Sequence, residues 1–389
     1  MAYQNVGTPR FYIDQIQYLK SIGFDFEKWY EDYGLTDSGT QYTYTDTGSA
    51  LARAMGQDPD LFTFNFETQK YIVGTNGSDF PQNWLYWALP TGFIKNNIVE
   101  GDNLGRYIAF INHDLGDRHY SIWSDWGLNN LENPRSEIIL NADDYGYWGS
   151  PKNDGVTIFG FDKTVDFNPS DSECKFIRMG FGWTGAGSES ENNVNEANLG
   201  GISYGTYYDM PHSPELDVTM TIENDGYDTI TTQGGAHLNN IRYNGAPMWE
   251  RADGTQVPPW TIGEPTAVGR RRGRRFWSMN FKYLSDKDLF ASNYMSNNYT
   301  ENPDGYDSAD LDTDADNNEV FYYTLDNDDS FVAQVLNKIG NGQRFIFQPD
   351  NTNNNPDQFA ICQLDQDSLK IKQVANGVYD ISLKIREVW

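Results

Sequence analysis

Short apolar segments recur along most of this chain, and their pattern predicts β-strands. Apolar and polar residues alternate strictly from Phe62 to Phe66, as in a strand with one buried face. Further aromatic or β-branched segments are separated by Gly, Asn, Asp and Pro turns, at 84–87, 107–111, 120–123, 137–140, 156–161, 175–179, 200–205, 218–222, 276–283, 344–347 and 379–389. The pattern predicts an all-β protein that contains a β-sandwich.

Three segments need separate treatment. Residues 11–22 fit a strand and a short helix equally well. Phe331, Val335, Leu336 and Ile339 have helical spacing, with Asp329 or Ser330 as N-cap and Gly340 as the stop. The Asp-Gly pair in 224–226 favours a tight turn, which predicts a hairpin between the strands 218–222 and 229–232.

A tract with almost no apolar residues between Gly180 and Leu199 predicts a long surface loop or a hinge between sheets. It divides the chain into parts. Residues 1–57 are expected to pack on or complete the last part, 58–199 to form the β-sandwich, and 200–389 to form a second β-rich domain with one short helix near 330–339. Two or three domains suit a length of 389 residues.

The charge of the chain limits its partners. It has 56 acidic and 28 basic side chains, so the net charge is −28. Nucleic acids and anionic lipids are held mainly by Lys and Arg, so neither is an expected partner. No apolar segment approaches the length of a membrane span, and residues 1–10 lack a signal-peptide pattern, so no membrane insertion is expected. Cys174 and Cys362 are expected to be buried thiols.

The histidines and acidic clusters predict no metal site or enzyme. The four histidines lack zinc-site spacing. The acidic series 310–319 has Ala315 and Phe321 where a calcium-binding EF-hand needs Gly and Glu, so a solvated loop is favoured and a weak divalent-ion site stays open. Common phosphate, dinucleotide and serine-hydrolase motifs are absent from the sequence. We expect no catalytic residue, cofactor or metal.

Two polar groups beside predicted strands are candidate binding sites. Asn112-His113-Asp114 follows an apolar strand, and a structural turn is favoured there over a ligand site. Asp143 and Asp144 lie beside Tyr145, Tyr147 and Trp148, a composition found at sugar-binding surfaces. Acidic and aromatic residues are so numerous in this chain that such neighbours arise by chance.

Five arginines stand out in the acidic chain. Guanidinium groups pair bidentately with carboxylates, so the cluster predicts a clasp between domains or between copies. The strand with Arg270 to Arg275 and the final strand 379–389 are therefore expected near subunit contacts. The candidate interface consists of Arg270, Arg271, Arg272, Arg274, Arg275, Trp277 and Trp389.

Two stretches resemble virion proteins of tailed bacteriophages, marine phages in particular. Residues 106–115, RYIAFINHDL, are similar to a strand of the galactose-binding-like jelly-roll domains found in phage tail proteins. The series GGISYG (200–205), YDMPHSP (208–214), TQGG (232–235), GRRFW (273–277) and FKYL (281–284) resembles the core of distal-tail and baseplate proteins, and so do 345–350, 357–362 and 381–387. The resemblance implies a jelly-roll domain combined with a tail-protein-like domain.

The resemblance also implies a structural role. We expect a component of the phage tail end, baseplate or tail-fibre adaptor, made in the host cytoplasm and assembled as a symmetric oligomer with other virion proteins. Abundant aromatic residues and long strands suit subunit interfaces. The alternatives are a head decoration protein, a module that binds host-surface glycan through residues 84–148, and a glycan depolymerase.

Overall fold

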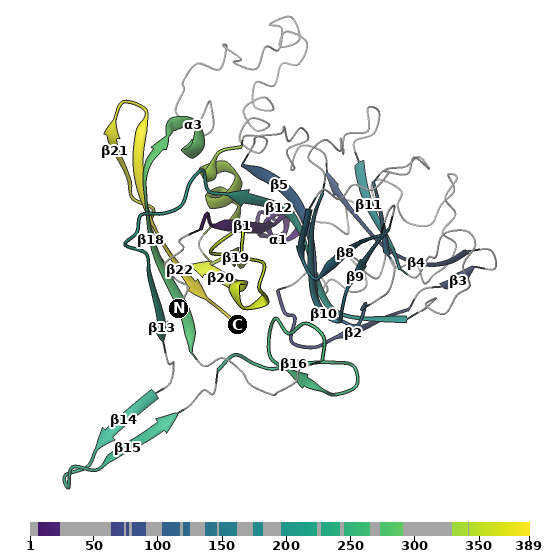
Figure 1. Ribbon diagram of the computed structural model, residues 1–389, viewed down its shortest axis with the longest axis horizontal. Coiled ribbons are helices and arrows are strands. Elements are labelled where there is room, and N and C mark those ends of the chain that lie inside the picture. Colours follow the sequence, from purple (N-terminus) through teal and green to yellow (C-terminus); the bar gives the residue numbers. More distant parts are fainter. Residues whose placement is uncertain are drawn as a thin grey trace, which may run out of the picture.

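The structure, a computed structural model, confirms an all-β fold. It describes residues 7–23, 64–73, 75–77, 80–90, 103–116, 120–124, 137–145, 148–161, 174–181, 196–223, 227–241, 245–264, 273–290, 329–340 and 342–389. Most strands belong to two antiparallel sheets, and Figure 1 shows the smaller sheet beside the β5, β10 and β12 part of the larger one. This arrangement resembles a β-sandwich.

The main sheet has twelve strands, and its order differs greatly from the order along the chain. From edge to edge it runs β13 (Thr219–Glu223), β18 (Arg274–Ser285), β22 (Val378–Glu387), β20 (Ala360–Leu364), β19 (Phe345–Gln348), β1 (Arg10–Asp14), β12 (Glu196–Asp209), β5 (Leu104–His113), β10 (Gly155–Phe161) and β7 (Glu137–Leu140). Off this path, β2 (Lys70–Val73) pairs with β12, and β21 (Ile371–Ala375) pairs with β22.

The central strands are buried on both faces. In β1, Phe11 and Ile13 belong to one hydrophobic cluster, whereas Tyr12 belongs to a second cluster on the opposite face. Successive side chains of a strand point to opposite faces, so a strand between two cores needs consecutive apolar residues. This explains why the strand 10–14 lacks the alternation of a half-buried strand.

The six-stranded sheet runs β3 (Thr75–Gly77), β4 (Phe80–Pro90), β11 (Cys174–Phe181), β6 (Tyr120–Ser124), β9 (Trp148–Pro151) and β8 (Ala142–Tyr145). All of its pairs are antiparallel. The predicted strands at 84–87, 120–123 and 175–179 lie in this sheet, whereas those at 107–111, 137–140 and 156–161 lie in the main sheet. These six strand predictions are therefore confirmed.

Short helices flank the main sheet. The ambiguous segment 11–22 contains both alternatives, because β1 is followed directly by α1 (Gln15–Ser21), where the Asp14 side chain caps the helix by accepting from Gln17 N at 2.8 Å. The predicted helix near 330–339 is confirmed and consists of π-helix η3 (Val332–Leu336) and α5 (Asn337–Ile339). Gly340 follows it with φ +46°. The other helical elements are α3 (Asp286–Leu289) and the 3₁₀ turn η4 (Pro356–Gln358), and β16 (Trp249–Glu250) pairs with β17 (Gln256–Val257) in a small separate sheet. No helix in the described ranges is long and apolar enough to cross a membrane.

The main sheet combines all three predicted parts of the chain. β12 runs through the expected boundary at 199/200 and pairs with β1 from the first part and with β5 from the second. β1 also pairs with β19 from the last part, so the N-terminal segment does contribute a strand to that region. The described end of the predicted loop, 196–199, belongs to β12, because its polar backbone finds partners in β2 and β5. Residues 182–195 lie outside the described residues.

Two local predictions were wrong. Residues 64–66 form no strand, although Phe64 and Phe66 are buried in the second cluster and Asn65 is exposed. The carbonyls of Phe64 and Phe66 instead accept hydrogen bonds from the side chains of Arg344 and Asn112. The predicted hairpin at 224–226 does not form either. β13 pairs with β18, and β14 (Tyr227–Thr231) pairs instead with β15 (His237–Ile241). Apolar packing of Met220 against the first core favours the distant partner over the adjacent one.

Candidate assembly surface

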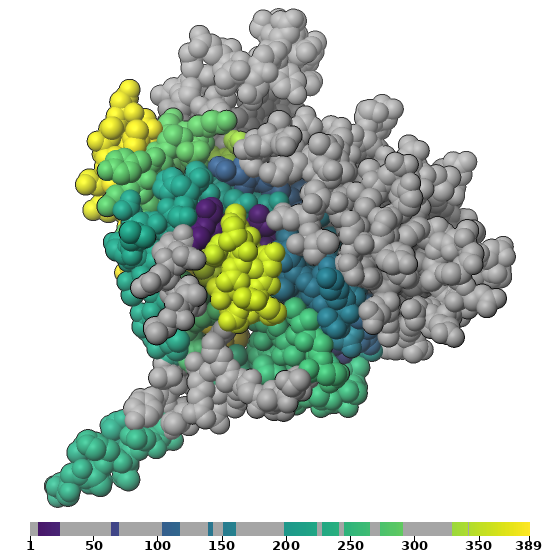
Figure 2. Space-filling model, in the orientation of Figure 1, coloured from purple at the N-terminus to yellow at the C-terminus, as the bar shows by residue number. Residues whose placement is uncertain are grey.

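A separate β-hairpin extends away from the body of the protein. Strands β14 and β15 form a two-stranded sheet of their own. Figures 1 and 2 show this hairpin as a finger that leaves the lower left of the molecule. We call residues 227–241 the arm. Its tip is a turn in which Thr232 N donates to Ala236 O at 2.9 Å, and Gly235 has φ +79°. A glycine fits there because a side chain strains this backbone conformation.

The two faces of the arm differ in polarity. On one face Ile230 lies opposite Leu238, and these side chains are 63% and 58% exposed. On the other face Thr229 bonds to Asn239 at 3.1 Å, and Thr231 bonds to His237 at 3.2 Å. The arm therefore presents an apolar pair to solvent, backed by a polar ladder that links its strands. A two-stranded hairpin alone is only marginally stable in water, so this apolar face would gain from a partner.

The main sheet ends close to the arm in sequence, at the edge strand β13. β18 covers one edge of β13, and no other described strand pairs with it. Met220 packs against the first hydrophobic core, whereas Ile222, two residues further along the same face, is 49% exposed. Open strand edges offer unpaired backbone donors and acceptors to another chain. β13 is therefore a second surface suited to association.

Arg274 and Trp389 lie at the same end of the main sheet. Arg274 opens β18 and is the register partner of Glu223 in β13. Its guanidinium lies 4.8 Å from the centre of the Trp389 ring, and both residues are half-buried. Of the predicted interface residues, this pair is partly exposed beside the edge strand.

Arg275 has a different position from the one predicted. Its guanidinium is buried and pairs bidentately with Glu387 of the same chain, at 3.1 Å for each contact. It also donates to the carbonyls of Asp357 at 2.6 Å and Phe359 at 2.9 Å. A clasp between domains or between copies was predicted, but Arg275 forms an ion pair between the neighbouring strands β18 and β22. The alternation of β18 turns its side chain inward.

The other predicted interface residues are either buried in the core or outside the described residues. Trp277 is also turned inward by the alternation of β18 and packs edge-on against Phe347, so it belongs to the core. Arg270, Arg271 and Arg272 lie outside the described residues. The arm was not predicted, although Gly234-Gly235 between two segments rich in Thr, Ile and Asn is a hairpin signal.

The Asn112-His113-Asp114 group holds strands together. His113 Nδ1 accepts from Leu115 N at 3.1 Å, so the ring proton is on Nε2. Nε2 therefore donates to Thr157 Oγ1 at 2.9 Å. Asn112 donates to Phe66 O at 3.0 Å, and Asp114 accepts twice from Asn198. These contacts agree with the favoured interpretation of this group as a structural turn.

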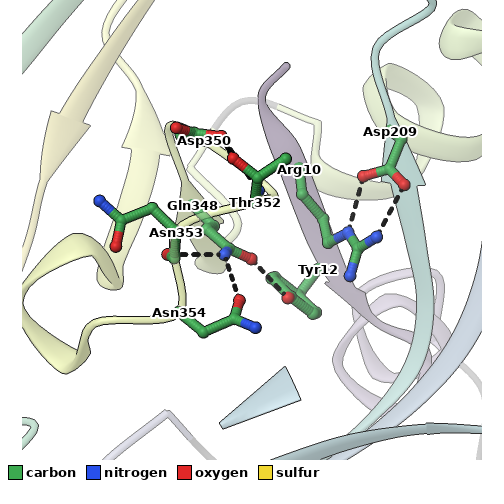
Figure 3. A network of polar contacts seen from close by, with 8 residues as sticks. All are labelled: Arg10, Tyr12, Asp209, Gln348, Asp350, Thr352, Asn353 and Asn354. Atoms are coloured by element: carbon green, nitrogen blue, oxygen red, sulfur yellow. Dashed lines mark hydrogen bonds and ion pairs between the residues drawn. The ribbon is translucent and has the colours of Figure 1, made fainter. Parts of the chain in front are cut away.

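A second polar network fastens β1, as Figure 3 shows. Arg10 binds Asp209 bidentately, with distances of 2.6 Å and 2.8 Å. Tyr12 donates to Gln348 Oε1 at 2.7 Å, and the Gln348 amide reaches the loop at Asn353 O and Asn354 Oδ1, both at 3.0 Å. The network joins β1 to β12 on one side and to the loop after β19 on the other.

A buried carboxyl group lies where β1 meets α1. Burial raises the pKa of Asp14 to about 6, although hydrogen bonds from Gln17, Ser203 and Tyr204 oppose that shift. The Ser203 hydroxyl is also 2.7 Å from Tyr107 Oη. Burial, and then the negative charge of Asp14, raise the pKa of Tyr107 well above its usual value. This group is closed off from solvent and caps a helix, which is a structural role.

Most of the other candidate site residues lie outside the described residues or have only their backbone described. The acidic series 310–319 and His119 lie outside the described residues. For Asp143, Asp144 and the aromatic residues of β4, β6 and β9, the structure describes the backbone alone. Within the part of the chain that it describes, no group of three His, Cys, Asp or Glu side chains is placed to hold a metal ion.

Comparison with protein-family models, curated proteins and solved structures finds no match for this chain.

Proposed function

We propose that the chain is a structural subunit of a tailed phage particle, at the tail end, baseplate or tail-fibre junction, and that it works as a symmetric oligomer. It would be made in the host cytoplasm and act within the virion. The observation that carries this proposal is the arm, which extends away from the body and exposes Ile230 and Leu238. Exposed apolar surface of this kind marks a site of association.

The energetics of burial support an assembling subunit. Full burial of an Ile or Leu side chain contributes about 1.5 to 3 kcal/mol. Ile230 and Leu238 are exposed in the isolated chain, so the free energy of their burial is gained only when a partner covers them. Large negative charge opposes premature association, and correct contacts must overcome it. The polar groups around Arg10 and His113 bond within the chain, which suits a rigid structural body.

The proposal assigns different roles to the two ends of the main sheet. The sandwich-like region around β5 and β10 would be a galactose-binding-like jelly roll that serves as a spacer or docking surface. The region around β13, β18 and β22 would make the contacts between copies. The large shared sheet is compatible with this division, because paired strands connect the two regions without a break.

Quantitative mass spectrometry of gradient-purified phage particles tests this function. The proposal expects this chain at a fixed ratio to the major tail proteins, unchanged through a second gradient. A host cytoplasmic protein of similar abundance in the lysate is the matched control, and it should fall away with purification. Loss of the chain together with that control would contradict the structural role.

A further inference from the structure

The arm and the outer edge of β13 have matching properties, as expected of two surfaces that bind each other. Each consists of short antiparallel strands with a backbone edge that no other described strand pairs with, and β13, β14 and β15 each contain five residues. Each also has an exposed apolar side chain, Ile222 in β13 and the Ile230–Leu238 pair in the arm. A strand added to β13 would continue both its backbone ladder and its apolar face.

The low charge of both surfaces suits a contact between copies of this chain. β13 has one charged residue, Glu223, and the arm has one carboxylate, Asp228, with no Lys or Arg. Two chains with net charges of −28 repel each other over most of their surfaces. A contact made by two nearly uncharged segments minimises this repulsion at close range.

The chemistry of the arm disfavours other classes of partner. Nucleic acid and anionic membranes need Lys or Arg, which residues 227–241 lack. Sugar binding usually needs an aromatic platform, and the arm contains a single aromatic residue, Tyr227, as its first residue. Backbone edges and a small apolar pair are suited to a protein strand.

The arm extends away from its own β13, so the two halves do not meet within one chain. Among the strands that the structure describes, β14 pairs with β15 alone, and Figure 1 shows the hairpin beyond the end of the main sheet. Every copy therefore carries both a projecting hairpin and an open edge. Such an arrangement allows one kind of contact to be repeated from copy to copy until a ring closes.

We propose that the arm of one copy adds to the β13 edge of a second copy and extends the main sheet across the subunit boundary, with Ile230 and Leu238 covering Ile222. This inference deepens the proposed function and rests on it. It assigns the contact to the sheet end that also contains Arg274 and Trp389. The partner is a second copy of this chain.

Sedimentation of the full-length chain over a concentration series tests the apolar half of the contact. The double variant Ile230→Asp and Leu238→Asp should raise the dissociation constant of self-association by about tenfold or more, because a charged residue would be buried at the contact. Leu216→Asp is the matched control, since Leu216 is 88% exposed and lies outside both segments. It should leave the dissociation constant unchanged.

Cross-linking tests which surfaces meet, and it does not depend on weakening the contact. A chain with Thr221→Cys in β13 is mixed with a chain with Thr229→Cys in the arm, and a short bis-maleimide is added. The proposal expects a dimer band for this mixture and a much weaker band when Ser368→Cys, at another exposed position, replaces the arm variant.

The outcomes separate this inference from the function on which it rests. Self-association that survives the arm double variant, or a cross-link that is no stronger than the Ser368→Cys control, overturns the inference and leaves the virion role standing. Absence of the chain from purified particles overturns the virion role. A monomeric wild-type chain at every concentration contradicts the arm contact, whatever the particles contain.

Discussion

Arg275 and Glu387 form an ion pair that is shielded from solvent on both sides, with 3% and 4% of their side chains exposed. Two guanidinium nitrogens of Arg275 reach the two carboxylate oxygens of Glu387, and the Arg275 backbone N–H adds a third contact at 3.1 Å. The pair joins β18 to β22 and holds the loop at 357–359 against them. It therefore stabilises the part of the main sheet that lies next to β13, the strand that precedes the arm.

Removal of one partner should strongly destabilise the protein. Arg275→Ala leaves Glu387 buried without its counter-ion, so we expect the free energy of unfolding to fall by about 3 to 5 kcal/mol. Chemical denaturation followed by tryptophan fluorescence measures this. The paired replacement Arg275→Met with Glu387→Leu is the control and should recover most of the loss, because it leaves no buried charge. A loss below about 1 kcal/mol for Arg275→Ala would show that the pair is not buried as described.

Arg274 should affect association and leave folding almost unchanged. It is half-buried beside Trp389, and Arg274→Glu places a second negative charge opposite Glu223. We expect the free energy of unfolding to change by less than about 1 kcal/mol. Self-association should weaken most at low salt, where repulsion between exposed charges is least screened. Sedimentation at several salt concentrations measures the effect, and an unchanged salt dependence would remove Arg274 from the contact.

Asp14 makes the stability depend on pH. Burial raises its pKa in the folded chain to about 6 from 3.8, so the folded state prefers the protonated form. Its contribution to stability is greatest below pH 3.8 and is lost as the pH rises to about 6 and beyond. Asp14→Asn keeps a good helix cap and removes the charge. Between pH 4 and pH 8, the stability of the variant relative to the wild type should rise by about 2 kcal/mol.

Urea denaturation at the two pH values measures that difference. Asp253→Asn is the control, because Asp253 is exposed and its pKa is lowered by hydrogen bonds from Thr255. It should not gain stability relative to the wild type as the pH rises. A pH-independent difference for Asp14→Asn would contradict the burial of this carboxyl group.

Gly205 should tolerate no side chain. A Cβ there would lie 2.0 Å from the carbonyl oxygen of Ile13, which is a backbone atom of the paired strand β1. Gly205→Ala should lower the free energy of unfolding by about 3 kcal/mol, because β1 and β12 must separate to make room. Gly234 in the arm has nothing within 4 Å of the same position, so Gly234→Ala should change stability by less than about 0.5 kcal/mol. Thermal melting of the two variants distinguishes these outcomes.

Local sequence predicted the strands well and their partners poorly. Aromatic and β-branched segments between turn residues located β5, β10 and β12, and alternation located β18, because both signals depend on neighbouring residues. The pairing of β13 with β18 depends on the packing of Met220 against a core built from distant segments. The Asp-Gly turn signal at 225–226 could not report that competition.

The position of β1 between two hydrophobic clusters could not be predicted, for a related reason. Phe11, Tyr12 and Ile13 are consecutive and buried, and only the tertiary structure shows that they belong to two different clusters. In the arginine cluster, composition could not distinguish Arg275, which is turned inward, from Arg274, which is at the surface. That distinction follows from the alternation of β18 once its pairing with β22 is known.

The most direct test of the virion role is immunogold electron microscopy of intact phage particles with antibodies against this chain. We predict gold clustered at one end of the tail, as expected for a baseplate or tail-fibre subunit. Gold over the head would contradict the tail position and indicate a decoration protein. Particles without gold, in a preparation where an antibody against a known tail protein labels normally, would contradict the structural role itself.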